Sequence, residues 1–284
     1  MQRLKINRKQ LKNVGKFGVE IEMYNVNPDM LITVLQTKGI LCRKEGYNHS
    51  SRSHWKLVTD STIRDNQGRN NYNSLSNGCW ELVSPILNGM DGMKELREVC
   101  LALYFIDAKV NKSCGLHIHH DTLAIGGLTD QQRNNLLNFY ARCERTIDAF
   151  MPKSRKRNNN SMCRSMIEAY MSALNYGSLT HLGRYNKLNF ESLQRHGTLE
   201  FRQHNSTIEF EKIYHWILFT AGLLHECKDK RSRQSMNFIE RAWTPKHLKL
   251  SKRTWNFFKE RMKVLDDCTR EDQNGRIRAS LRAA

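Results

Sequence analysis

Three short stretches of the chain alternate between apolar and ionisable residues, which is the period of a β-strand that buries one face. The ionisable positions are Glu20 and Glu22 in the first stretch, His117 and His119 in the second, and Glu200, Arg202 and His204 in the third. Side chains two residues apart on a strand project from the same face, so each stretch carries its charges on one side. If the three strands join one sheet, its polar face would form a reaction chamber.

The remaining pattern indicates helices and strands in alternation, without internal repeats. Apolar residues at helical spacing predict helices at 28–39, 91–108, 128–150, 165–174, 208–226 and 250–265. Shorter apolar runs bounded by turn residues predict strands at 17–24, 54–60, 78–85 and 114–120, and an antiparallel pair at 184–193 and 196–205. Pro28 suits the first turn of a helix, and Thr129 suits an N-cap.

The composition is typical of a folded chain of one large or two modest domains, with 39% hydrophobic residues, five Trp and eleven Phe among 284 residues. The longest apolar run, 216–224, has the length of a buried helix and is too short to cross a membrane. The eight cysteines include no C-x-x-C pair, and the first ten residues lack the apolar segment of a secretory signal. We therefore expect a cytoplasmic protein with free thiols and no membrane contact.

The formal net charge of +18 is concentrated towards the C-terminus. From Lys228 onward the chain has 16 Lys and Arg but only 7 Asp and Glu, and the apolar periodicity weakens. We therefore expect a core domain at residues 1–228 and a basic, helical extension at 229–284. The excess charge either keeps the surface soluble or contacts an acidic partner, such as a nucleic acid, nucleotide phosphates or another polyanion.

Glu20 and Glu22 are the first candidates for metal binding. Two carboxylates about 7 Å apart on one strand face repel each other unless a cation lies between them. Carboxylate oxygens are the preferred ligands of Mg²⁺ and Mn²⁺, and the imidazoles of a neighbouring strand would give a mixed site. Glu81, on the strand at 78–85, and Asp60, at the end of the preceding strand, could join them. The alternatives are solvated Glu on an edge strand, structural histidines and a turn role for Asp60.

Glu200 and Arg202 share a strand face, which places a guanidinium beside a carboxylate. Such an arginine suits phosphoryl transfer, because its donors meet the charge that grows on the transferred oxygens. Arg155 and Arg157, in the basic loop 152–160, could hold the phosphates of a nucleotide. The alternatives are an ion pair within the sheet and a solvated charged loop. The sequence contains neither the P-loop nor the Rossmann glycine motif.

These motifs, in this order, resemble the amidoligase family, a group of carboxylate–amine ligases of glutamine synthetase and γ-glutamylcysteine synthetase type. The resemblance is carried by FGVEIE, by ELVSPIL followed by a glycine and a helix, and by VNKSCGLHIHHD, the PKSRKRN loop and GTLEFRQHNST. It spans roughly residues 14–227, while the basic tail lies outside it. The resemblance implies an α+β fold, in which a curved, mostly antiparallel sheet forms a funnel-shaped active site with helices packed on its outer face.

The resemblance also implies ATP-dependent formation of an amide or peptide bond through an acyl phosphate, with two or three Mg²⁺ or Mn²⁺ ions. The implied metal ligands are Glu20, Glu22, Glu81, His117 and Glu200. Arg202 would stabilise the phosphoryl group, Asp60 would act near the substrate, and His119, Arg155 and Arg157 would lie at the nucleotide. The motifs do not identify the acid and the amine, which a peptide or a protein could carry.

Three other classes of protein fit parts of the same pattern. A guanidino kinase-like phosphotransferase would use a related carboxylate-lined sheet, a metal-dependent nuclease would use the same acids with the high positive charge, and a nucleic-acid-binding protein would need only the basic tail. Formation of an amide distinguishes a ligase from the first class, and a requirement for ATP distinguishes it from the second. Binding of nucleic acid without Glu20 and Glu200 would identify the third.

Overall fold

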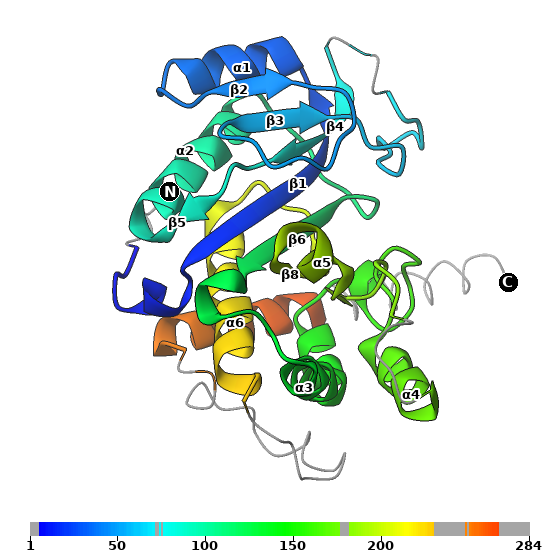
Figure 1. Ribbon diagram of the computed structural model, residues 1–284. Helices are drawn as coiled ribbons and strands as arrows, with labels where there is room; N and C mark the ends of the chain where they lie inside the picture. Colours follow the sequence, from blue (N-terminus) through cyan, green and yellow to red (C-terminus); the bar gives the residue numbers. More distant parts are fainter. Residues whose placement is uncertain are drawn as a thin grey trace, which may run out of the picture.

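The computed structural model describes residues 6–229 and 248–266, apart from 72–73, 75, 177–181 and 249. Eight strands of this described part form one open sheet (Figure 1). The strands are β1 (Lys16–Val26), β2 (Cys42–Lys44), β3 (Trp55–Val58), β4 (Gly78–Val83), β5 (Leu87–Asn88), β6 (Gly115–Asp121), β7 (Leu188–Asn189) and β8 (Thr198–Asn205). They lie in the order β2-β3-β4-β1-β6-β8-β7, with β5 paired to β1.

All of these strand pairs are antiparallel except β2 and β3. The predicted α+β class and the mostly antiparallel sheet are therefore confirmed. β1 crosses the middle of the sheet, with β4, β3 and β2 on one side and β6, β8 and β7 on the other (Figure 1). The strands with alternating charge thus lie next to one another, because β1 pairs with β6 and β6 pairs with β8.

Two of the helices begin where the sequence predicts, at Pro28 and after the N-cap Thr129. The helices are α1 (Pro28–Gln36), α2 (Gly89–Phe105), α3 (Asp130–Ala149), α4 (Met166–Tyr176), α5 (Glu191–His196), α6 (Phe210–Cys227) and an unlabelled helix at 252–266, with short 3₁₀ turns η1 (Gln10–Asn13), η2 (Leu123–Ile125) and η3 (Lys153–Arg155). Asn27 is the N-cap that precedes Pro28, and its side chain accepts a hydrogen bond from the Met30 amide. Thr129 forms a capping box with Gln132. Both caps satisfy amides that lack a partner within the helix.

The apolar face of the central strands enters the main hydrophobic core. Val19, Ile21 and Met23 of β1 are buried there, in one cluster with Leu96 of α2 and Ile217 of α6. The opposite face of β1 carries Glu20 and Glu22. The alternation in the sequence therefore separates an apolar face, which is buried in the core, from a polar face that is left to line a cavity.

The predicted strand at 184–193 is mostly wrong. Only Leu188–Asn189 pairs with β8, and the next residues form the short helix α5. Gly197 ends this helix with a φ of 65°, a conformation that glycine adopts without strain, and β8 starts directly after it. Because the short helix α5 lies between the paired strands β7 and β8, this segment lacks the apolar–polar alternation by which a strand is recognised in the sequence.

The C-terminal part contains the predicted amphipathic helix, at 252–266. Its Phe258 is buried in the main core, and Arg261 donates hydrogen bonds to the Phe150 carbonyl and to Asn205 Oδ1. The predicted boundary at residue 228 remains a prediction, and most of the extension, at 230–247, 249 and 267–284, lies outside the described residues. Of the helices that are described, none combines the length and apolar character needed to span a membrane.

Candidate active site

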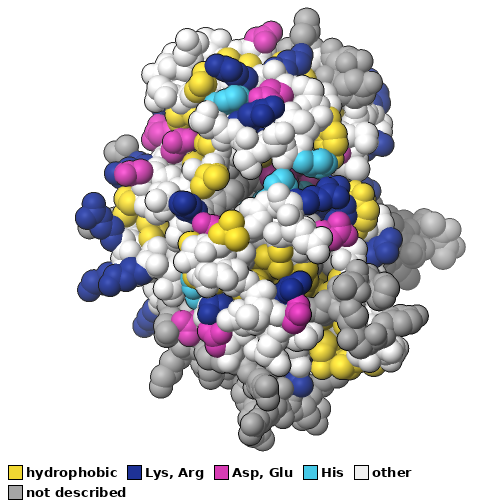
Figure 2. All heavy atoms as spheres, viewed as in Figure 1, with side chains coloured by type: hydrophobic (Ala, Val, Ile, Leu, Met, Phe, Trp, Pro, Cys, Tyr) yellow, Lys and Arg dark blue, Asp and Glu magenta, His cyan; other side chains and the backbone are white. Residues whose placement is uncertain are grey.

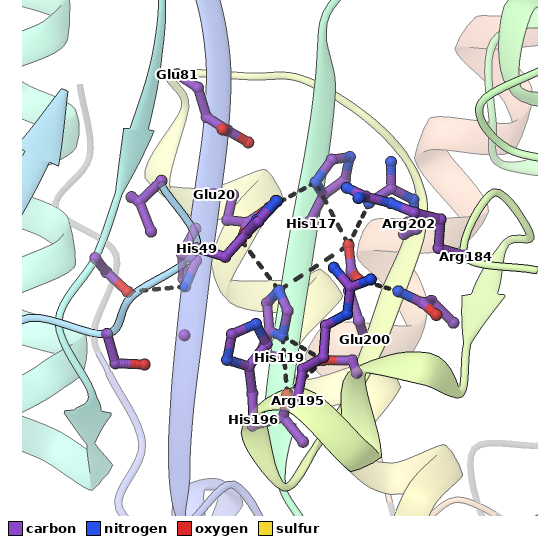
Figure 3. Close-up of a pocket in the computed structure, with 18 of the residues that line it drawn as sticks. Glu20, His49, Glu81, His117, His119, Arg184, Arg195, His196, Glu200 and Arg202 are labelled. Carbon is purple, nitrogen blue, oxygen red and sulfur yellow. Dashed lines mark hydrogen bonds and ion pairs between the residues drawn. The ribbon is translucent and has the colours of Figure 1, made fainter. Parts of the chain in front are cut away.

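The polar face of the central strands lines a cavity of about 920 Å³. The strand register places charged residues directly opposite one another: Glu20 opposite His117, Glu22 opposite Glu81, and His119 opposite Glu200. Residues paired across antiparallel strands project from the same face, so β1, β4, β6 and β8 bring these groups together. Figure 3 shows the side chains of Glu20, His117, His119 and Glu200 in mutual contact over this face of the sheet.

Nine of the ten residues expected at the site line this cavity. They are Glu20, Glu22, Asp60, Glu81, His117, His119, Arg155, Glu200 and Arg202. We call Glu20, Glu22, Glu81, His117 and Glu200 the acidic floor of the cavity.

Arg157 does not line the cavity, contrary to its expected place beside Arg155. Its side chain is exposed, and its backbone amide donates a hydrogen bond of 2.9 Å to Asp148 Oδ2. The backbone at Arg157 has a φ of 48°, a left-handed turn that separates the two arginines of the loop. Only Arg155 of this pair is available to a ligand in the cavity.

His204 lies on the opposite face of β8 from Glu200 and Arg202, so its predicted place on the polar face is wrong. Leu116 and Ile118 of β6 pair with His204 and Phe201, which leaves one extra residue on β8. This β-bulge reverses the alternation. The His204 ring packs 5.3 Å from the Trp216 ring, and burial lowers its pKa well below the usual value.

His117 lies at the centre of the acidic floor. Its Nδ1 is 2.8 Å from Glu20 Oε2 and 3.6 Å from Glu200 Oε1, and its Nε2 is 3.5 Å from Glu22 Oε1. One imidazole thus contacts carboxylates from β1 and β8, on either side of β6. Such contacts fix the ring, as the hydrogen bonds around a metal-binding histidine do.

Gly115 allows Glu22 to approach β6. The Gly115 amide donates a hydrogen bond of 2.6 Å to Glu22 Oε2. A Cβ atom at Gly115 would lie 2.9 Å from His117 Nε2 and 3.2 Å from Glu22 Oε1. Glycine is therefore needed at the start of β6 for close contact between the floor residues.

Glu81 is a buried carboxyl group surrounded by other carboxyl groups. Burial raises its pKa well above the usual value, and the negative charges of Glu20, Glu22 and Asp60 raise it further. A divalent cation in this position would remove both causes, because it replaces the lost hydration and offsets the repulsion.

Three overlapping groups of side chains could hold such a cation, since their ligand atoms lie within 4.8 Å of one another. These groups are Glu20, Glu81 and His117; Glu20, His119 and Glu200; and Glu22, Asp60 and Glu81. Carboxylates with one imidazole are a donor set that suits Mg²⁺ or Mn²⁺ better than zinc or copper.

Glu200 and Arg202 form a buried ion pair beside the floor. Arg202 Nη1 lies 2.5 Å from Glu200 Oε1, and Asn189 donates to Glu200 Oε2 at 2.6 Å. Burial would raise the pKa of Glu200, but Arg202, His119 and His117 outweigh it and lower that pKa. Arg202 lines the cavity, and its buried Nε has no hydrogen-bond partner among the described residues.

His119 lies between the carboxylates of Glu20 and Glu200 and the hydroxyl group of Thr198. Its Nε2 is 3.3 Å from Glu20 Oε1, and its Nδ1 is 2.9 Å from Thr198 Oγ1. Burial would lower the pKa of His119, but the charges of Glu200 and Glu20 raise it above the usual value. The pKa of Glu20 is lowered in turn, because the two histidines outweigh its burial.

Arg155 and Asp60 enter the cavity from loops. The buried Arg155 guanidinium donates to the Cys114 carbonyl at 2.6 Å, while its Nε lacks a partner among the described residues. Asp60 Oδ1 accepts hydrogen bonds from the Thr62 amide and hydroxyl, at 2.6 and 2.7 Å. Asp60 therefore has the turn role considered as an alternative, and its carboxylate still lies near Glu22 and Glu81.

Several further residues of the cavity were missed by the sequence analysis, and six of them bear on its chemistry. They are His49, Lys56, Arg184, Asn189, Arg195 and His196. Lys56 could have been recognised, because it is the one charged residue in the otherwise apolar strand β3. The others lie in loops, in the two-residue strand β7 and in the short helix α5, where no periodicity marks them.

Comparison with known proteins gives a family and a weak structural likeness to solved structures. A family model described as "Putative amidoligase enzyme" matches residues 14–183 and 172–224. No functionally curated protein matches the sequence. Among solved structures, a bifunctional glutathione synthetase from Pasteurella multocida is 14% identical and superposes with a TM-score of 0.39, covering 92% of this chain. The chain spans about half of that protein, 48% of its length, and a likeness this weak does not establish a shared fold.

Proposed function

The chain belongs to the amidoligase family, and we propose that it is an ATP-dependent carboxylate–amine ligase. It would form an amide or peptide bond through an acyl phosphate, with Mg²⁺ or Mn²⁺ as the metal. We further propose that its open sheet is the curved funnel of the glutamine synthetase and γ-glutamylcysteine synthetase type, with helices on the outer side. The observation that carries the proposal is that the acidic floor and two buried arginines, Arg155 and Arg202, line one cavity.

The metal ions would bind at the acidic floor. Glu20, Glu22, Glu81, His117 and Glu200 supply carboxylate oxygens and one imidazole within reach of one another, which fits two or three ions of the magnesium type. Bound there, the ions would neutralise phosphate charge and orient the phosphate groups. The raised pKa of Glu81 supports this assignment, because a carboxyl group placed among carboxyl groups is poorly stabilised without a cation.

The residues of the chain would hold the reacting groups as follows. A carboxylate is a poor acylating agent because its leaving group would be oxide, and phosphorylation supplies a better one. The guanidinium group of Arg202, which lines the cavity, would stabilise charge on the transferred phosphoryl oxygens, and that of Arg155 would bind the nucleotide's phosphates. His119 would lie near the nucleotide, and Asp60 would accept the proton of the attacking amine.

The direct test is mass spectrometry of mixtures of candidate acids and amines incubated with ATP and Mg²⁺. We expect a product that equals acid plus amine less one water. Glu200→Gln should abolish its formation, whereas Asp91→Asn, an exposed carboxylate on α2, should leave it unchanged. Full ATP-dependent condensation by Glu200→Gln would show that this site is wrongly assigned.

A metal-dependent nuclease or nucleic-acid-binding protein is the second candidate, because the net charge of +18 would favour binding to a polyanion. A nuclease would nick supercoiled DNA with Mg²⁺ alone, while the ligase requires ATP. A guanidino kinase-like enzyme would instead phosphorylate a guanidino acceptor and form no amide. Three readouts therefore distinguish these enzymes: ATP-dependent condensation for the ligase, nicking of DNA without ATP for the nuclease, and phosphorylation of a guanidino acceptor for the kinase.

A further inference from the structure

The mouth of the cavity has the opposite charge to its floor. His49, Arg184, Arg195 and His196 line the cavity from three separate segments: the loop between β2 and β3, the residues before β7, and α5. We call these four residues the cationic mouth. Figure 3 shows them arranged around His119 and Glu200, and in Figure 2 histidine and basic side chains gather beside a hollow in the same face.

The two arginines of the cationic mouth lack a carboxylate partner in the described part of the chain. Carboxylates lie nearby, since Glu191 of α5 and Asp121 of β6 also line the cavity, but neither is within 4 Å of either guanidinium. Arg184 lies over the ring of its neighbour Tyr185, 5.4 Å from the centroid. Guanidinium groups that no carboxylate neutralises are available to an anionic ligand.

The positive charges are close enough to affect one another. Burial lowers the pKa of His49, and the charges of Arg184 and Arg195 lower it further. The His196 ring lies 6.2 Å from the His119 ring, which connects the mouth to the floor. Burial lowers the pKa of His196 as well, so both rings are neutral at pH 7 and the positive charge of the mouth comes from Arg184 and Arg195. Two guanidinium groups without an ion-pair partner create a positive potential that an anion would relieve.

The loop that carries His49 is held in place by the buried Lys56 of β3. Lys56 Nζ donates to the Asn48 carbonyl, the Asn48 side chain and the Ser50 carbonyl, at 3.0, 2.8 and 2.8 Å. All three ammonium protons are thus used on the residues on either side of His49. The segment of the mouth that carries His49 is therefore preorganised before a ligand arrives.

We propose that the cationic mouth is a second binding subsite, which takes a phosphate or carboxylate group of a ligand whose other end lies at the acidic floor. The inference deepens the proposed function and rests on it for the role of the floor. Two ligands would supply such a group: the phosphate chain of the nucleotide, or a second anionic group on the acid substrate. In the second case the acid substrate is a polyanion, such as an acidic peptide.

Binding measured by calorimetry tests the subsite with the full-length protein. The nucleotide probes are ADP and AMP, and the carboxylate probes are triglutamate and triglutamine peptides. The double variant Arg184→Gln/Arg195→Gln should bind at least one anionic probe about tenfold more weakly or worse, the loss expected for a charge-assisted hydrogen bond. The control is Arg43→Gln/Arg253→Gln, which makes the same change in net charge at two exposed residues outside the cavity.

The pattern of losses identifies the ligand group. Weaker binding of ADP with unchanged binding of AMP assigns the subsite to nucleotide phosphates, and weaker binding of triglutamate assigns it to the acid substrate. Equal binding by the wild type and the double variant overturns the proposal, as does a wild type that binds neither anion. These measurements need no turnover, so they test the subsite independently of the ligase activity. If the protein binds anions at the mouth but never condenses an acid with an amine, the proposed ligase function is wrong and the subsite proposal stands.

Discussion

Glu81 is the residue at which the metal hypothesis is easiest to test, because its carboxyl group is buried and faces other carboxyl groups. Its raised pKa means that the proton competes with a metal ion for the same oxygen atoms. Metal binding at this position should therefore weaken as the pH falls, since the protonated carboxyl group is a poor ligand.

Replacing Glu81 with Gln keeps the shape and removes the charge. Mutating a residue that only hydrogen-bonds to a metal ligand typically lowers metal affinity about 10–100-fold. Since Glu81 would bind the ion itself, we expect its replacement to lower the affinity for Mn²⁺ and Mg²⁺ by at least that much. In a thermal melt, Mn²⁺ should raise the melting temperature of the wild type by more than that of Glu81→Gln, which keeps the group of Glu20, His119 and Glu200. Asp91→Asn, at a side chain that is 93% exposed, is the control. An equal response of Glu81→Gln and the wild type to Mn²⁺ would exclude Glu81 as a ligand.

Most strand residues of the site could be predicted from the alternation, whereas the residues of the cationic mouth could not. Glu20, His117 and Glu200 follow from backbone geometry, because a period of two fixes the face of a strand. The β-bulge that turns His204 into the core has no signature in the alternation. Arg195 reaches the mouth only because a turn of helix interrupts the chain between β7 and β8.

At the scale of elements, a buried polar network joins α3, β7 and β8 to the loop that carries Arg155. Lys187 Nζ lies 2.7 Å from both Glu144 Oε1 and Asp148 Oδ1, and its side chain is fully buried. Gln203 donates to Asp148 Oδ1 at 2.6 Å and approaches the Arg155 carbonyl at 3.5 Å. The network therefore positions the basic loop against the sheet.

Lys187→Met leaves two buried carboxylates without their cation. We expect a loss of about 3–5 kcal/mol in the free energy of unfolding, the usual result of removing one partner of a buried ion pair. Urea denaturation measures it, with Lys94→Met on the exposed face of α2 as the control, which should change stability by less than about 0.5 kcal/mol. Equal stability of the two variants would mean that the network contributes nothing to the fold.

His215 joins α6 to the helix at 252–266. Its Nδ1 lies 3.1 Å from Thr254 Oγ1, its ring stacks on Phe257, and its Nε2 is 3.7 Å from Glu211. Burial, with a smaller contribution from Arg253, lowers the pKa of His215 to about 4. The neutral ring is therefore the form that supports the contact between the two helices at pH 7.

Acid should weaken the contact between these two helices. His215 is protonated near its ordinary pKa of 6.5 in the unfolded chain, but only near 4 in the folded chain. The contribution of the neutral ring to the free energy of unfolding is therefore complete above pH 6.5 and is lost as the pH falls from 6.5 to 4. The slope for one group is at most about 1.4 kcal/mol per pH unit. Denaturation of His215→Gln at several pH values should show a smaller decline than the wild type, and equal declines would exclude this group.

For the whole molecule, the order of helices and strands could largely be predicted, but the order of strands in the sheet could not. Hydrophobic alternation identifies which face of β1 is buried without saying that β4 and β6 are its neighbours. The C-terminal region was expected to lie outside the core because its charge is high and its periodicity weak. Yet Phe258 is buried in the main core, and Arg261 contacts Asn205 at the end of β8.

If the helix at 252–266 belongs to the same cooperative unit as the sheet, a cavity made under it should destabilise the entire chain. Phe258→Ala removes a side chain that is 1% exposed, and such truncations cost about 3–5 kcal/mol. Val264→Ala, on the same helix at a side chain that is 60% exposed, should change stability by less than about 0.5 kcal/mol. Urea unfolding should show one transition, shifted to lower urea by Phe258→Ala alone. A separate early transition in that variant would instead show that the extension unfolds independently of the site.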